Sequence, residues 1–106
     1  MLTSREIVVT GLGIVSPVGI GCDLLREAVL AGRSGIRPLE RFDSSSLNVP
    51  FGGEIPDFDP KQWVRPRKSL KVMSRDIQLG FAAAELAMAD AAIAPGSLDP
   101  DRFGVV

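Results

Sequence analysis

The stretch that decides the fold lies near the start of the chain and reads Glu6-Ile7-Val8-Val9-Thr10-Gly11-Leu12-Gly13-Ile14-Val15-Ser16-Pro17-Val18-Gly19. Residues 7–10 are β-branched without interruption, a pattern typical of a central strand buried on both faces. The glycines after them tolerate backbone angles that other residues resist, and Pro17 keeps the loop from continuing as a helix. We therefore predict a buried strand over 7–10, followed by a tight turn with positive backbone angles at Gly11 and Gly13.

Two longer helices follow from the pattern of apolar residues. Such residues recur at helical spacing over 23–31, and Gly32 is a natural stop. Ser74 can cap a longer, alanine-rich helix that runs from Arg75 to about Ala92. Much of the circumference of this second helix is apolar, which indicates burial in a larger body. A strand, a glycine loop and a helix in this order are typical of the start of a layered α/β fold.

The middle of the chain is less regular. Residues 34–59 form a long stretch rich in proline, glycine and serine, after which short helices are predicted over 60–64 and 67–73. Three phenylalanines are expected to anchor the irregular stretch to the body, namely Phe42, Phe51 and Phe58. Residues 103–106 begin a second strand that the sequence leaves unfinished, so we expect a truncated piece of a longer protein.

Composition excludes several kinds of site. The chain has 106 residues, no histidine, one cysteine, 45% apolar residues and a formal net charge of −1. This length allows one domain at most. Without histidine the chain lacks the commonest acid–base group near neutral pH and the commonest metal ligand, so we expect no metal site. A single cysteine cannot form an internal disulfide, and we see neither a signal peptide nor a membrane span, which together predict a cytoplasmic protein.

Short motifs stand in a characteristic order along the whole chain. They are residues 8–13, 16–19, 30–36, 42–43, Phe51, Gly53, Phe58, 67–68, Met73, Gln78 and 102–106. This order resembles that of the β-ketoacyl-acyl-carrier-protein synthases, and most closely the type II enzymes of fatty-acid synthesis. Each motif is weak alone, and the assignment rests on their order and spacing.

The resemblance implies an α/β fold of the thiolase-like type, layered as α/β/α/β/α, of which residues 1–106 would be the start of the first half. It also implies an acyltransferase, a 3-oxoacyl-acyl-carrier-protein synthase that works as a homodimer. Such an enzyme joins an acyl group held on a cysteine to malonyl-acyl carrier protein, with loss of carbon dioxide. In the family this cysteine and two histidines lie further along the chain. We therefore expect no catalytic residue in this span, no cofactor, and no condensation by the 106-residue chain alone.

A run of basic residues is the one charged feature above background. Six basic residues lie between 61 and 75 with no acid among them, namely Lys61, Arg65, Arg67, Lys68, Lys71 and Arg75. Such a run is often just a solvated face, but it can also steer and hold an acidic partner. The resemblance assigns Lys68 and Lys71 to docking of acyl carrier protein, and a spacing of three places them on one helix face. Val72 departs from the family pattern, which often has a basic residue there. Nucleic acid is a poorer partner, because the whole chain is not basic and Trp63 is the one aromatic residue in the run.

Other candidate sites and functions stay open at this stage. Cys22 lies near a helix start, where a thiol can become nucleophilic. No histidine is present to act as its base, so we interpret Cys22 as a partly buried structural thiol. Gly11 and Gly13 could begin a dinucleotide-binding fingerprint, but Ser16 stands where the third glycine would be. Two functions therefore remain beside the enzyme: a non-catalytic module that binds acyl carrier protein or a sister subunit, and a nucleotide-binding domain.

Overall fold

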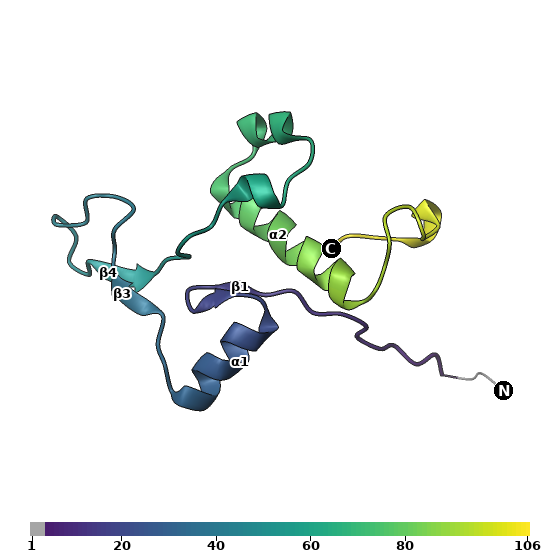
Figure 1. Cartoon of the computed structure of the whole chain (residues 1–106), viewed down its shortest axis with the longest axis horizontal. Coiled ribbons are helices and arrows are strands. Elements are labelled where there is room, and N and C mark those ends of the chain that lie inside the picture. The colour runs from purple at the N-terminus through teal and green to yellow at the C-terminus, as the bar shows by residue number, and fades with distance from the viewer. Residues whose placement is uncertain (1–3) are drawn as a thin grey trace.

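The computed structural model of the chain describes residues 4–106, which form short strands, two α-helices and three short 3-10 helices. In chain order the elements are β1 (Val15–Ser16), β2 (Gly19–Ile20), α1 (Cys22–Ala31), β3 (Ile36–Pro38), β4 (Phe51–Gly53), η1 (Pro60–Gln62), η2 (Arg67–Val72), α2 (Arg75–Asp90) and η3 (Pro100–Arg102). The strands form two separate antiparallel pairs, β1 with β2 and β3 with β4. Figure 1 shows β1 between α1 and α2, with the β3–β4 pair at one side and the C-terminal segment at the other.

Helix α1 confirms the helix predicted over 23–31, with a start one residue earlier. Gly21 precedes it at φ 106°, and Gly32 ends it in the left-handed conformation at φ 66°. Because a side chain at such angles would be strained, these two glycines define both ends of the helix. Ala28 is the buried residue of α1, whereas Val29 and Leu30 are largely exposed. The helix therefore packs through a narrow stripe of its surface.

Helix α2 confirms the predicted long helix and ends two residues earlier than expected, at Asp90. The side chain of Ser74 accepts a hydrogen bond from the main-chain N–H of Ile77 at 3.4 Å, as predicted for an N-cap. Ala82 is completely buried, and Val64, just after η1, is 1% exposed. Together with Ala28 these residues form the core that the structure describes. Small and β-branched side chains thus hold α2 against its neighbours.

The prediction of a buried strand over residues 7–10 is wrong for this structure. These residues form no strand, and Ile7, Val8 and Val9 are 95%, 70% and 79% exposed. The two strand pairs of the described chain lie elsewhere, so nothing pairs with this run. The strand predicted over 103–106 is likewise absent, and these residues are exposed. The local sequence favours strands, but a strand needs a neighbouring strand to satisfy its main-chain groups.

Gly11 and Gly13 serve a different purpose from the one predicted. Neither has a positive φ; the glycines that do are Gly19, Gly21, Gly32 and Gly96. Instead, a Cβ at either position would collide with the α2 helix, within 2.7 Å of the Ala91 nitrogen at Gly11 and of the Ala87 nitrogen at Gly13. The glycines therefore allow the N-terminal segment to approach the helix backbone closely. The turn comes later, where Val15 pairs with Ile20 in the β1–β2 hairpin.

The expected phenylalanine anchors are only partly present. Phe42 and Phe51 are both 55% exposed, so the prediction that they anchor the irregular stretch is wrong. Phe58 is half-buried and lies beneath the guanidinium group of Arg75, 5.4 Å from its ring centre. The stretch is held mainly by the β3–β4 pair, in which Ile36 faces Gly53 and Pro38 faces Phe51. Backbone pairing therefore replaces aromatic packing in this part of the chain.

The described chain is extended compared with a single compact domain. Its radius of gyration is 17.7 Å, whereas a compact domain of this length has about 13 Å. Many apolar side chains remain exposed, including Val72, Ile77 and Phe103. These residues are typical of surfaces that contact another part of a protein or a partner.

Candidate partner-docking site

The candidate site is built on the two 3-10 helices that precede α2. Asp59 caps η1, because its carboxylate accepts the main-chain N–H of Lys61 at 3.0 Å. Pro60 occupies the first helical position, where its missing N–H costs nothing. Val64 is buried, Trp63 is half-buried, and η1 packs against α2. These apolar contacts fix the segment that carries the basic run.

Lys68 and Lys71 lie together on η2, and both are exposed. The sequence predicted a helix over 67–73, and the structure shows a 3-10 helix over 67–72. A 3-10 helix has three residues per turn, so residues three apart lie directly above one another. The positions of Lys68 and Lys71 are therefore one turn apart on η2, which is the basis for expecting their ammonium groups on one side of it. Ser69 and Leu70 are half-buried between them.

Val72 continues this surface as an apolar residue. It is 86% exposed. An exposed valine beside two lysines offers a partner both an apolar contact and charge. The electrostatic part of the site therefore rests on Lys68 and Lys71, with Lys61, Arg65 and Arg67 exposed nearby in the sequence.

Cys22 is the first residue of α1 and is half-buried, as predicted for a structural thiol. Its thiol donates to the carbonyl oxygen of Leu12, with Sγ and O 3.7 Å apart. The main-chain N–H of Leu12 in turn donates to the Asp90 carboxylate at 2.9 Å. Cys22 and Asp90 thus hold the N-terminal segment between α1 and α2. From the sequence alone Asp90 had no assigned partner.

The space that a phosphate would need beside Gly11 and Gly13 is occupied by α2. A Cβ at Gly11 would lie 2.7 Å from the Cβ of Ala91, and at Gly13 the helix backbone is closer still. In a dinucleotide fingerprint the glycines let the cofactor approach the backbone. Here they let a helix approach it, which argues against nucleotide binding at this loop.

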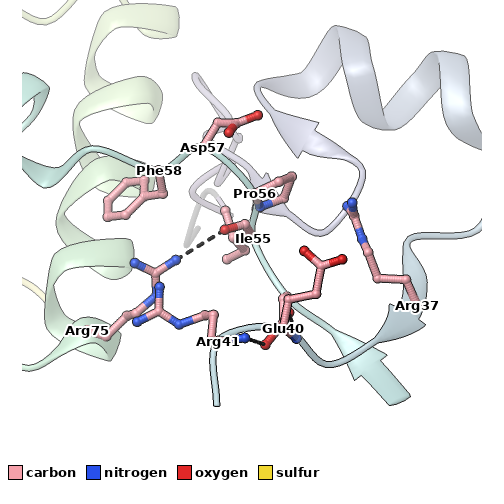
Figure 2. A pocket seen from close by; sticks show the side chains of 9 residues that line it. Arg37, Glu40, Arg41, Ile55, Pro56, Asp57, Phe58 and Arg75 are labelled. Atoms are coloured by element: carbon pink, nitrogen blue, oxygen red, sulfur yellow. Dashed lines mark hydrogen bonds between the residues drawn. The ribbon is translucent and has the colours of Figure 1, made fainter. Parts of the chain in front are cut away.

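A second charged region went unnoticed in the sequence. An open pocket of about 320 Å³ is lined by residues from β3 and the segment after it, from the segment after β4 and from α2, namely Arg37, Glu40, Arg41, Glu54, Ile55, Pro56, Asp57, Phe58 and Arg75. Figure 2 shows these side chains around the pocket. Arg41 and Arg75 are far apart in the chain, and only folding brings them together. No spacing rule applied to the sequence would have found the pair.

Residues 4–106 lack two kinds of feature. No helix in this range is both long and apolar enough to cross a membrane. In the same range, no three side chains of the types that ligate metals come together.

Comparison with known proteins places these features in a family. A model of the beta-ketoacyl synthase N-terminal domain matches residues 4–106. The 3-oxoacyl-[acyl-carrier-protein] synthase 2 of Synechocystis is 37% identical over 99% of this chain and 25% of its own length. The ketoacyl synthase beta subunit of tetracenomycin polyketide synthase from Streptomyces glaucescens is 42% identical over 100% of this chain and 26% of its own length.

A solved structure agrees with these sequence matches. The ishigamide ketosynthase/chain length factor superposes with a TM-score of 0.71 and 36% identity, over 92% of this chain and 23% of that one. The match confirms the predicted fold class, an α/β fold of the thiolase-like type. The chain spans about a quarter of the length of the curated relatives named above. It is homologous to condensing enzymes of fatty-acid and polyketide synthesis, and it belongs to the beta-ketoacyl synthase N-terminal domain family.

Proposed function

We propose that this chain is the N-terminal segment of a 3-oxoacyl-acyl-carrier-protein synthase that extends acyl chains in fatty-acid or polyketide synthesis. The family match over residues 4–106 supports this proposal. The complete enzyme would join an acyl thioester on its cysteine to malonyl-acyl carrier protein, releasing carbon dioxide and forming a 3-oxoacyl product. It would act as a cytoplasmic homodimer. Residues 1–106 would be the first part of its N-terminal domain and would carry no catalytic residue.

The contribution of this segment would be to dock acyl carrier protein at Lys68 and Lys71. The single observation that supports this role is that both lysines are exposed one turn apart on η2, within a basic run that contains no acid. Cationic groups arranged in this way raise the rate at which an acidic partner associates and fix its orientation. They do not need to touch the reacting atoms.

Carrier-protein binding by the chain tests the docking role. The double variant Lys68→Glu with Lys71→Glu is compared with a control double variant, Arg26→Glu with Arg33→Glu. The control residues lie on α1 and just after it, and their replacement changes the net charge by the same amount. At low ionic strength we expect the first pair to weaken binding by about tenfold and the second to change it little. Equal effects of the two double variants would mean that net charge, and not this face, attracts the carrier.

Two further measurements test the rest of the proposal. The 106-residue chain should release no carbon dioxide from malonyl-acyl carrier protein, because it contains no histidine and its one thiol is held by α1 and Leu12. Sequencing the gene beyond codon 106 should reveal a cysteine at a strand-to-helix turn, followed by two histidines. A stop codon there would favour the alternative, a non-catalytic module that binds acyl carrier protein or a sister subunit.

A further inference from the structure

The pocket shown in Figure 2 contains two arginines held side by side at one end. Arg75 is the first residue of α2, and one of its guanidinium nitrogens donates to the carbonyl oxygen of Ile55 at 3.1 Å. The same guanidinium lies over the ring of Phe58. Neither the carbonyl nor the ring carries a full negative charge. Two of the contacts that hold Arg75 in place are therefore with groups that carry no full negative charge.

Arg41 adds a second positive charge at this end of the pocket. Partial burial and the nearby Arg41 both lower the pKa of Arg75, whereas Glu54 raises it. Arg75 nevertheless stays charged near neutral pH, because the ordinary pKa of a guanidinium group lies far above 7. The two neighbouring guanidinium groups repel one another, and an anion placed between them would offset that repulsion.

Of the three carboxylates that line the pocket, Glu54 is committed to main-chain groups, Asp57 lies apart from the two arginines, and Glu40 lies between Arg41 and Arg37. Glu54 accepts the main-chain N–H groups of Glu40 and Arg41 at 3.0 and 3.1 Å, so its oxygens fasten the loop that carries Arg41. Figure 2 shows Asp57 at the far side of the pocket from the Arg41–Arg75 pair. At the opposite end Arg37 donates to the carbonyl oxygen of Pro17.

Charge counting indicates which anion the pocket would accept. Over all nine lining residues the charges balance, with three arginines against three carboxylates. Within this balance the guanidinium groups of Arg41 and Arg75 lie side by side, and the nearby carboxylate of Glu54 is held by two main-chain N–H groups. A singly charged carboxylate would therefore disturb the charge balance of the pocket less than a doubly charged phosphate. Arginine forks match the planar carboxylate with two parallel hydrogen bonds.

We propose that Arg41 and Arg75 form a two-guanidinium clamp that receives one aspartate or glutamate side chain of the acyl carrier protein. This inference rests on the proposed function, and it adds a second contact beyond Lys68 and Lys71. Arg75 closes the same basic run that contains the two lysines. Its fixed side chain would lose little rotamer freedom on binding, which favours a specific contact over simple attraction.

Binding of carrier protein to single variants of the chain tests the clamp. We expect Arg41→Gln and Arg75→Gln each to weaken binding about three- to tenfold, and Arg75→Lys, which keeps the charge but loses the fork, to fall between these and the unmodified chain. Arg26→Gln on α1 removes one positive charge outside the pocket and is the matched control. In Arg41→Gln the main-chain N–H signals of residues 40 and 41 should stay in place by NMR, which shows that Glu54 still holds the loop.

Two small probes identify the anion independently of the carrier. Acetate and inorganic phosphate are titrated at constant ionic strength while the side-chain Nε–H signals of Arg41 and Arg75 are followed. We expect acetate to shift both signals and phosphate to bind no more tightly than acetate. Tighter binding of phosphate would overturn the assignment to a carboxylate.

The outcomes separate this inference from the proposed function. If the unmodified chain does not bind acyl carrier protein, the proposed docking function fails. If it binds, and if Arg41→Gln and Arg75→Gln bind as tightly as Arg26→Gln, then only the clamp is refuted. Loss of binding in the two pocket variants but not in the control supports the clamp.

Discussion

Replacing Gly13 by alanine tests the contact that joins the N-terminal segment to α2. A Cβ at this position would lie 2.6 Å from the main-chain nitrogen of Ala87 and closer still to the carbonyl oxygen of Ala83. Ordinary contact of a Cβ begins at 3.4 Å, so the segment would have to retreat by about 0.8 Å to clear the Ala87 nitrogen and by more to clear the Ala83 oxygen, and a helix backbone has no rotamer to change. The same retreat would stretch the hydrogen bond from Leu12 to Asp90.

We expect Gly13→Ala to lower the free energy of unfolding by about 1–3 kcal/mol, the usual cost of overpacking. Gly104→Ala is the matched control, because a Cβ there meets nothing within 4 Å and its φ is not positive. That variant should be neutral or more stable by up to about 1 kcal/mol, since alanine restricts the unfolded chain. Urea unfolding followed by far-ultraviolet circular dichroism measures both. Equal midpoints for the two variants would refute the reasoning.

Three further predictions concern single side chains. Gly80→Ala should raise stability by about 0.5–1 kcal/mol, because a Cβ at this exposed helical position meets nothing within 4 Å; a lower melting temperature would contradict it. Ser74→Ala should cost about 0.5–1 kcal/mol by removing the cap on Ile77, and Ser74→Asp should retain most of that stability in the same melting assay. Main-chain N–H groups lower the pKa of Glu54 from its ordinary value of 4.5, so the folded state gains stability above pH 4.5 that is lost as the pH falls through the lowered pKa. Glu54→Gln should flatten this acid-side loss in a series of melts, and an unchanged slope would count against the assignment.

The helices could be predicted because their signals are local. Gly32 ends α1 and Ser74 begins α2, as the sequence indicated, since a cap depends on residues within one turn. The capped start of η1 at Asp59 follows the same logic. The type of helix over 67–72 was missed, because 3-10 and α-helices share the same residue preferences over a single turn.

The remaining features depend on contacts between distant segments. Residues 7–10 have the composition of a buried strand. A strand is buried only when another segment pairs with it or covers it, and local composition does not show which segment does so. A turn with a positive φ was predicted at Gly11 from the conformational freedom of glycine. Its actual role is to allow close contact with α2, which lies far along the chain. The Arg41–Arg75 pair depends on the β3–β4 pairing and on the start of α2, so it could not be predicted from the sequence. The exposure of Lys68 and Lys71 agrees with the docking prediction, which itself awaits the binding experiment.

The unpaired run at residues 7–10 has a practical consequence for handling the protein. Its amides and carbonyls have no ladder partner, and its β-branched side chains are open to solvent. Such a run is a template on which a second molecule can add its own strand, and stacking of this kind grows with concentration. Dilute samples should therefore stay monodisperse longer than concentrated ones, and a lysine introduced at Thr10 should act as a gatekeeper that delays fibre formation.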